Sequence, residues 1–376
     1  MNIIVKEVTT KKELKAFVKF NIDLYRYCPY HVPGLIADDM MTLSKEKNPA
    51  FEFCESKYFL AYRGDKIVGR IAGIINHKAN EIWNQKYARF GFVDFVDESE
   101  VAGRLFQAVE AWAKIKGMEA VHGPLGFTDL DHEGLLIKGF DQLATMATSY
   151  TYPYYPQHVE RLGYRKDQDW VEFKIKIPET IPERHGRIAE LVKKKLGLKV
   201  LKFRKTKDVW PYAHKLFELL NNAYSSIYGY SPLSGKQIEY YIKMYIPMLR
   251  LELVSVVVRE SDNEIVAVGI CIPNMSTALK KAGGSLFPFG FAPLLKSLYG
   301  KKLPVVDLLM IGVDPSYQNK GVNAVIVVDI FNELSKLGTE FCESNPELEI
   351  NDKVQSMWDG FEVENHKKRR AYIKEL

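Results

Sequence analysis

Residues 313–328 read VDPSYQNKGVNAVIVV, and the fold depends on the structure that this stretch adopts. Its second half, residues 324–328, is rich in β-branched residues, which are stiff about χ1 and suit a strand. Its first half places a glycine among polar residues, as in a loop that opens a helix and binds an anion. The rest of the chain has to decide between a strand and a helix.

The length of the chain indicates how many domains it forms, and its charge limits the kinds of partner that it could bind. A chain of 376 residues is long enough for two domains of ordinary size, each with its own core. Lys and Arg number 52 and Asp and Glu 47, so the net charge of +5 is small for so large a surface. We therefore expect no nucleic-acid partner, although an anionic small molecule is allowed.

The N-terminus and the cysteines bear on the compartment. Residues 1–17 carry charges every few positions and lack the apolar core of a signal peptide, and no window has the apolar length of a membrane span. We therefore expect a cytoplasmic protein without a membrane partner. The four cysteines have neither zinc-site nor disulfide spacing, so we expect reduced structural thiols.

Two parts of the chain repeat one plan. Residues 58–76 and 251–273 each read as two apolar runs around a polar turn, which is a hairpin pattern. A third apolar run follows in both halves, at residues 88–95 and 305–313, and each is followed by a helix-like segment. The first helix has Val101, Leu105, Val109 and Trp112 at helical spacing and stops at Gly117.

The repeat decides between a strand and a helix for the second half of residues 313–328. In the second half Val327, Phe331 and Leu334 keep helical spacing up to Gly338, so residues 324–337 are predicted to form a buried helix despite their valines. Each half then closes with a short strand, a short helix ending in Gly and an aromatic residue, and a last strand. The predicted fold class is mixed α/β, with domains at residues 1–178 and 179–376 joined near two prolines.

This element order resembles that of the GCN5-related N-acetyltransferase (GNAT) superfamily, whose loop pattern is Gln or Arg, two residues, Gly, one residue, then Gly or Ala. Gln318 and Gly321 match this pattern, and Asn323 departs from it. The whole chain also resembles a bacterial group of tandem GNAT-like proteins, on the stretches 123–141, 152–164, 229–241 and 283–295. The resemblance implies two tandem acyl-CoA N-acyltransferase-like domains, with acetyl-CoA or another acyl-CoA as cofactor.

The loop has its own anion chemistry. A glycine-bearing turn that opens a helix lets backbone N–H groups converge on a phosphate, and the helix dipole adds positive charge. Lys320 adds a formal charge and Gln318 a neutral donor. We expect the pyrophosphate or 3′-phosphate of coenzyme A to bind Gln318, Asn319, Lys320, Gly321, Val322 and Asn323. A solvated polar cap is the alternative.

The first half lacks a comparable anion-binding loop. Its corresponding loop, residues 96–103, carries Asp97, Glu98 and Glu100 where the anion would bind. Because like charges at close range repel, we predict that only the second domain binds coenzyme A and that the first is a structural or acceptor-shaping copy.

The resemblance also implies which residues would contact the reacting groups. In the superfamily a backbone N–H of the central strand meets the thioester carbonyl where the strand splays from its neighbour, which here falls at Ile311, Gly312 and Val313. Gly312 is either part of a bulge or a packing glycine. Glu343, which ends a strand beside the splay, is the first choice for the base, and Asn351 is a weaker candidate for binding the acceptor. The usual Tyr acid is replaced by Ser356, so Tyr317 or water would protonate the thiolate.

Two further polar stretches have simpler interpretations. Residues 129–133, DLDHE, suggest metal ligands, but adjacent residues seldom face one ion, so we expect no metal and favour a polar loop. The basic run His366–Arg370 is expected at a charged sheet edge.

We therefore predict an acyltransferase whose second domain moves an acetyl or other acyl group from acyl-CoA to a small-molecule amine. Two alternatives stay open. One is a non-catalytic ligand-binding or regulatory protein that has kept the fold. The other is a long-chain enzyme like the N-acyl amino acid synthases, for which the apolar run at residues 285–299 is the nearest feature.

Overall fold

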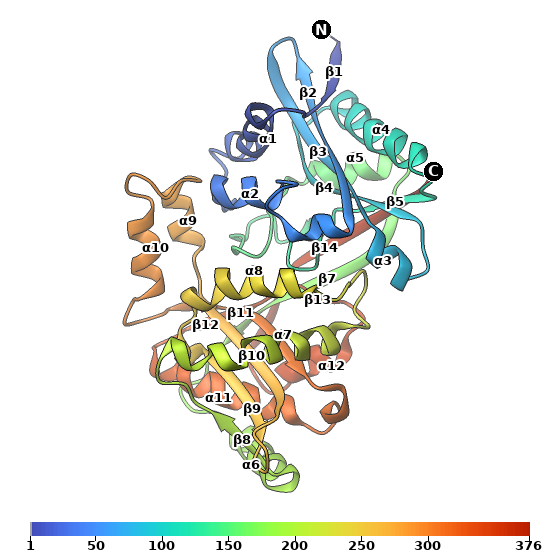
Figure 1. Ribbon diagram of the computed structural model, residues 1–376. Coiled ribbons are helices and arrows are strands. Elements are labelled where there is room, and N and C mark those ends of the chain that lie inside the picture. The colour runs from blue at the N-terminus through green and yellow to red at the C-terminus, as the bar shows by residue number, and fades with distance from the viewer. Residues whose placement is uncertain (1) are drawn as a thin grey trace. The chain divides into compact units, whose positions relative to one another are not determined.

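The computed structural model describes residues 2–376, which form two compact units (Figure 1). Each unit gathers segments that lie apart in the sequence. Unit 1 comprises the chain up to Val171 together with Met275–Leu294 and His366–Leu376. Unit 2 comprises Glu172–Asn274 and Leu295–Asn365. The strands β7 (Arg165–Lys176) and β14 (Val363–Glu375) therefore contribute residues to both units.

The sheet of unit 1 has the order β1-β2-β3-β4-β5-β14. Its strands pair antiparallel except β4 with β5, which run parallel from Tyr87–Ala120 to Arg89–His122. The short strand β6 pairs with β14. The bounds are β1 Ile3–Glu7, β2 Cys54–Arg63, β3 Lys66–Asn76, β4 Tyr87–Phe95, β5 Ala120–Gly123 and β6 Leu135–Lys138.

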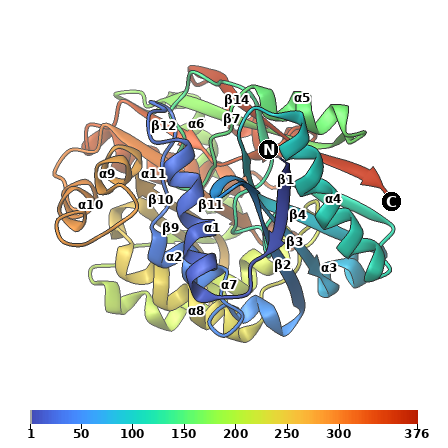
Figure 2. The ribbon, with the colours of Figure 1, turned by 90° about the horizontal axis from the view of Figure 1, so that it is seen from above.

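Helices cover both faces of this sheet. Figure 2 shows α1 (Lys11–Leu24) and α4 (Ser99–Ile115) on opposite sides of β1 to β4. The helix α4 packs closely on β3, because a Cβ atom at Gly69 would lie 2.7 Å from Leu105 Cδ1. The other helices of unit 1 are α2 Ile36–Thr42, α3 His77–Ile82, α5 Tyr154–Arg161 and α9 Ser276–Ala282, and α10 Phe291–Leu298 begins there.

Unit 2 repeats the plan with the order β7-β12-β11-β10-β9-β8, and β13 also pairs with β7. Here too one pair, β11 with β12, is parallel within an antiparallel sheet. The strands are β8 Leu198–Leu201, β9 Val254–Arg259, β10 Ile265–Pro273, β11 Val305–Val313, β12 Phe341–Ser344 and β13 Glu347–Leu348. The helices are α6 Glu183–Leu196, α7 Trp210–Tyr224, α8 Gly235–Tyr245, α11 Val322–Lys336 and α12 Asp352–Gln355.

The valine-rich stretch is a helix, as the repeat predicts. The helix α11 buries Val325, Ile326 and Ile330 against the sheet of unit 2. A Cβ atom at Gly269 of β10 would lie 2.9 Å from Ile330 Cδ1, so the glycine permits the same close approach that Gly69 permits in unit 1. Tertiary packing of an apolar face therefore outweighs the strand propensity of the valines.

The basic run of the last strand lies inside the sheet, so the expectation of a charged sheet edge is wrong. Lys367 is 1% exposed and Arg369 0% exposed. Arg370 donates to both carboxylate oxygens of Asp169, at 2.7 and 3.0 Å. Burial alone would raise the pKa of the Asp169 carboxyl, but hydrogen bonds from Arg370, Lys166 and Lys368 hold it below its ordinary value.

Two expectations about the chain as a whole can be compared with the structure. The four cysteines are free thiols, and all are buried, as expected for structural residues. None of the helices within residues 2–376 combines the length and the apolar character needed to cross a bilayer.

Candidate active site

The sheet of unit 2 opens between its two parallel strands. β11 pairs with β12 from Val305–Phe341 to Leu308–Ser344, whereas its pairing with β10 continues to Val313. Asn345 closes the end of the parallel ladder, because its N–H donates to Leu308 O and its Nδ2 to Leu309 O. The remainder of β11 therefore presents backbone groups to side chains instead of to β12.

Tyr224, the last residue of α7, occupies this part of β11. Its hydroxyl donates to the carbonyl oxygen of Ile311 at 2.9 Å, and the N–H of Ile311 donates to the same hydroxyl at 3.2 Å. One phenol group thus satisfies both backbone groups of a residue at which the resemblance to the superfamily implies contact with the thioester carbonyl. Sequence reasoning did not connect Tyr224 with Ile311, because the contact joins residues that are 87 positions apart.

Gly312 is a packing glycine. Its position in the ladder is regular, opposite Val268. A Cβ atom at Gly312 would lie 2.9 Å from Leu220 Cδ2 and 3.1 Å from Leu219 Cδ2, both on α7. The missing side chain lets α7 approach β11, which brings Tyr224 to its neighbour Ile311. Of the two interpretations of Gly312, the structure supports packing.

The loop from Asp314 to Gly321 opens α11. Asn319 and Gly321 have left-handed φ angles of 60° and 79°, and Gly321 is the residue that precedes the helix. Within residues 2–376 the backbone N–H groups of Asn319, Lys320, Gly321, Val322 and Asn323 have no hydrogen-bond acceptor. Five consecutive amides at the positive end of a helix dipole form a site that suits an anion. Gln318 instead uses its side chain inside the loop, donating to Val313 O at 3.2 Å.

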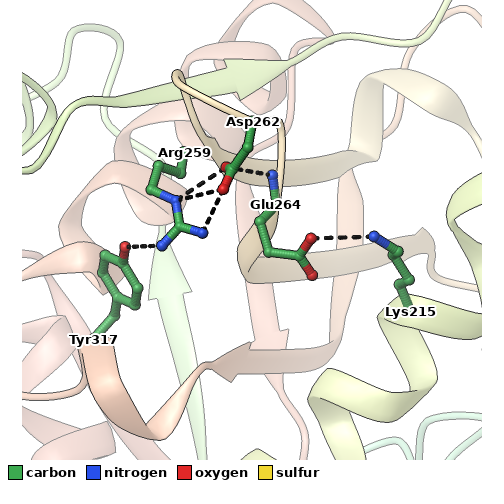
Figure 3. Close-up of polar contacts among 5 residues, drawn as sticks. All are labelled: Lys215, Arg259, Asp262, Glu264 and Tyr317. Carbon is green, nitrogen blue, oxygen red and sulfur yellow. Dashed lines mark hydrogen bonds and ion pairs between the residues drawn. The ribbon is translucent and has the colours of Figure 1, made fainter.

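Tyr317 attaches the start of this loop to the β9–β10 hairpin (Figure 3). Its hydroxyl accepts from Arg259 Nη1 at 3.4 Å, and Arg259 forms an ion pair with Asp262 at 2.6 Å. That ion pair lowers the pKa of the Asp262 carboxyl to about 2. The ammonium of Lys320 lies 5.3 Å from the centre of the Tyr317 ring. The loop is thus anchored at its base and carries a cation near its tip.

The two residues predicted for catalysis lie in different surroundings. Glu343 is buried in β12, where it aligns with Asp307 of β11 and Lys174 of β7. Asn351 precedes α12, and its Oδ1 accepts from the N–H of Val354 at 3.4 Å as a helix cap. Ser356, at the position of the usual Tyr acid, donates its hydroxyl to Lys353 O.

A third carboxylate, Glu347 of β13, has the properties of a base. Its Oε1 accepts from Trp358 Nε1 at 3.0 Å, while its buried Oε2 has no hydrogen-bond partner in the described chain. Burial raises the pKa of the Glu347 carboxyl to about 7, although hydrogen bonds from Trp358 and Ser344 act in the opposite direction. Such a group holds or releases a proton near neutral pH. Nothing in the sequence distinguishes Glu347 from neighbouring glutamates, because only the fold shows its burial.

The backbone groups at the corresponding strand end in unit 1 are bonded by the unit's own side chains. β4 pairs with β5 only as far as Arg89–His122. At its end the N–H of Phe95 donates to the Tyr155 hydroxyl at 3.0 Å, and the Tyr154 hydroxyl donates to Phe95 O at 2.7 Å. Both tyrosines belong to α5, and Tyr155 also accepts from Tyr25. The free end of this strand is therefore satisfied within the protein.

The loop of unit 1 carries paired acids. Asp97 accepts from His158 Nε2 at 2.7 Å, and Glu98 forms an ion pair with Arg63. Glu100 lies 3.9 Å from Arg104 in the first turn of α4. These carboxylates stand before a helix N-terminus and use its positive potential themselves, so the loop is poorly suited to a phosphate.

The acidic stretch of residues 129–133 forms a structured loop. The Oδ2 atom of Asp131 accepts from the N–H groups of Phe127 at 2.8 Å and Thr128 at 3.1 Å. Throughout the described chain, no group of three or more His, Cys, Asp or Glu side chains is placed to hold a metal ion.

Comparison with known proteins agrees with this architecture. No protein-family model matches the chain. Among solved structures, a tandem GNAT protein from the clavulanic acid biosynthesis pathway superposes over 100% of this chain and 98% of its own, with a TM-score of 0.56 and 9% identity. The chain has the tandem GNAT fold. At that identity the likeness establishes the fold alone.

Two bacterial proteins are similar to this tandem GNAT-fold chain in sequence. Protein YghO of Escherichia coli (strain K12) is 26% identical over 99% of this chain and 95% of its own length. The bacterial ceramide synthase of Caulobacter vibrioides (strain NA1000 / CB15N) is 29% identical over 83% of this chain and 80% of its own length. The similarity to both proteins extends across both halves of the repeat.

Proposed function

We propose that unit 2 is an N-acyltransferase module, which binds an acyl-coenzyme A and transfers the acyl group to a small-molecule amine. The observation that carries this proposal is the run of five amides without acceptors at the start of α11, next to a central strand that has parted from its parallel neighbour. The fold and the similarity to a protein named bacterial ceramide synthase support it.

The residues of the loop fit a phosphate-bearing ligand. The N–H groups from Asn319 to Asn323 would hold the pyrophosphate, in a turn where Asn319 and Gly321 have positive φ angles. Lys320 adds a charge that backbone amides cannot supply. Asn323, where the family pattern has Gly or Ala, contributes its backbone N–H to this site.

The reacting groups are assigned from their contacts. A coenzyme A thioester supplies an acyl carbon that is already activated for attack by an amine. The N–H of Ile311 donates to the Tyr224 hydroxyl at 3.2 Å, so it would polarise the carbonyl once the carbonyl oxygen replaces that hydroxyl as its acceptor. Tyr224 is thus better placed than Tyr317 to give a proton to the departing sulfur, because Tyr317 contacts Arg259. Glu347 would take the proton that the amine loses.

Glu343 stays in this scheme as a second candidate base. It lies one residue before the last parallel pair, whereas Glu347 follows that pair. Comparing Glu343→Gln with Glu347→Gln in an established turnover separates the two. Loss of the rate in Glu347→Gln alone assigns the base to Glu347, and loss in Glu343→Gln alone assigns it to Glu343.

The proposal is tested by titrating the full chain with acetyl-CoA and then assaying an amine library with acyl donors of several lengths. Binding together with amide formation supports the enzyme. Binding without turnover on any amine favours the alternative, a ligand-binding protein that has kept the fold. Absence of binding contradicts the assignment of the loop.

A long-chain acyl group is a second candidate for the substrate. Phe287 and Phe289 are each 78% exposed, and the ring centres of Phe287 and Phe291 lie 6.2 Å apart at the start of α10. Exposed aromatic groups of this kind suit contact with an acyl chain or another apolar ligand. Under this variant, turnover rises with acyl length from acetyl to palmitoyl.

A further inference from the structure

Unit 1 contains a polar cavity that the proposed function does not use. Its volume is about 90 Å³, which accommodates a group of several heavy atoms. Its wall is formed by α1 and the region after it, by β3 and β4, by the segment from Pro124 to Leu135, and by Ser149 and Thr151. The wall residues that matter here are Asn21, His31, Asp39, Arg70, Phe92 and Asp94.

His31 faces this cavity with both ring nitrogens free. The side chain is 6% exposed, and in residues 2–376 neither Nδ1 nor Nε2 has a hydrogen-bond partner. The imidazole stacks on the Tyr25 ring at 4.4 Å, which fixes its plane. Burial, with Arg70 and Lys280 nearby, lowers the pKa of His31 to about 3. The ring is therefore neutral and offers one acceptor nitrogen to the cavity.

The positive charge of Arg70 is already neutralised. Its Nε donates to Asp94 Oδ2 at 2.7 Å, its Nη1 donates to Phe17 O at 3.0 Å, and both partners of the ion pair are buried. Asn21 Nδ2 donates to the same Asp94 oxygen at 3.1 Å. Because the pair is internally satisfied, Arg70 offers little net charge to an anion in the cavity.

Asp39 differs from Asp94 in having no cation of its own. No Lys, Arg or His of the described chain forms an ion pair with Asp39, which lies on the wall from α2. Burial raises the pKa of its carboxyl to about 6, with Asp38, Asp94 and Asp131 acting in the same direction and Arg70 against it. A cation placed beside Asp39 would stabilise its charged form.

The backbone at the cavity is strained. Phe92 has a φ of 45°, and the pairing of β3 with β4 shifts register between Arg70 and Ala72, opposite this part of β4. A bulky residue rarely adopts a left-handed conformation, and such strain is concentrated at functional sites. The bulge turns β4 where it borders the cavity.

From this geometry we infer that the cavity of unit 1 binds the ammonium group of a small primary amine, between the carboxylate of Asp39 and the free imidazole nitrogen of His31. Both acceptors lack partners, and the guanidinium that lines the wall, that of Arg70, is paired with Asp94. The inference does not rest on acyl transfer by unit 2, and it can hold if that proposal fails.

Three probes of similar size and different charge test this inference on the full chain. They are ethanolamine as the cation, ethylene glycol as the neutral compound and glycolate as the anion. We expect ethanolamine to bind at least about tenfold more tightly than the other two, with a shift of the His31 Cε1–H resonance. Tighter binding of glycolate, equal binding of all three, or no response of His31 to ethanolamine would overturn the inference.

Matched variants locate the binding. Asp39→Asn should weaken ethanolamine at least tenfold, whereas Asp38→Asn, on the exposed side of the same helix, should not. His31→Phe keeps the ring stack on Tyr25, removes both nitrogens and should also weaken binding. Affinity in the wild type should rise with pH through about 6, as Asp39 ionises. Wild-type affinity in a folded Asp39→Asn protein, confirmed by its thermal transition, would contradict the assignment.

Discussion

The two units differ most at the loop that follows the central strand. Each loop joins the end of that strand to a helix on the sheet, and each stands where one parallel pair stops. In unit 1 the acids Asp97 and Glu98 are paired with His158 and Arg63. In unit 2 the loop has a lysine at its tip and amides without acceptors. The same backbone plan thus serves as a closed structural joint in one unit and as a candidate anion site in the other.

The ends of the two central strands are bonded by tyrosines from different helices. Two tyrosines of α5 bind Phe95 in unit 1, whereas a single tyrosine of α7 binds Ile311 in unit 2. A duplicated fold therefore does not predict duplicated chemistry. Because a tyrosine bonds the strand end in both units, the residues of the following loop distinguish the two copies.

The largest effect is expected at Glu347. Glu347→Gln keeps the size of the side chain and removes the base, so kcat should fall by about a hundredfold or more, as for loss of a general base. Coenzyme A affinity should be unchanged, as measured by calorimetry. Glu362→Gln, which alters an exposed ion pair with Lys176, is the matched control. Retention of kcat in Glu347→Gln would exclude this residue as the base.

The pH dependence gives a second signature of Glu347. A base acts when deprotonated, so the rate should rise as the pH increases through about 7, the pKa of this carboxyl. The raised pKa also means that the folded chain holds a proton that the unfolded chain releases, so stability falls as the pH rises from about 4.5 to 7. Glu347→Gln should therefore be the more stable protein at pH 8, as measured by thermal unfolding.

Lys320→Glu makes the loop of unit 2 resemble that of unit 1. Replacing a cation by an anion next to a phosphate site should weaken coenzyme A binding about thirtyfold, ~2 kcal/mol, with a smaller effect at high salt. Lys301→Glu makes the same charge change on an exposed residue before β11 and should leave the affinity unaltered. Equal losses in the two variants would show a general effect of net charge instead of a local site.

Variants of Tyr155 and Tyr224 distinguish a structural role from a catalytic one. Tyr155→Phe removes a buried hydroxyl that bonds Phe95 and Tyr25, so unfolding should be easier by about 1–3 kcal/mol while coenzyme A affinity is unchanged. Tyr224→Phe should instead lower kcat and alter the pH profile. Denaturant unfolding and steady-state kinetics of both variants measure the difference. A loss of coenzyme A affinity in Tyr155→Phe would place unit 1 in the binding site.

The smallest effect is expected from neutralising the acids of unit 1. The double change Asp97→Asn with Glu98→Gln removes two carboxylates at the surface and leaves an amide oxygen as acceptor for His158 and Arg63, so stability should change by less than about 1 kcal/mol. It should not create a second coenzyme A site, because the loop of residues 96–103 still has no cation corresponding to Lys320. Appearance of a second site would show that the charges alone keep the ligand out.

The sequence predicts the repeated plan well because periodicity and glycine positions mark it. The helix α11 and the strand β11 lie where the repeat places them, although local propensity argued against the helix. Contacts between distant residues are not visible in a single sequence. The contact of Tyr224 with Ile311, the buried Oε2 atom of Glu347 and the interior position of β14 all depend on which elements pack together. His31 illustrates the same limit, because only the cavity shows that its nitrogens are free.

The central claim is that only unit 2 can bind coenzyme A. Calorimetric titration of the full chain with acetyl-CoA measures it most directly, through the number of sites. One site per chain, weakened by Lys320→Glu and unaffected by Asp97→Asn with Glu98→Gln, is the predicted result. Two sites per chain, or one site that persists unchanged in Lys320→Glu, would contradict the account.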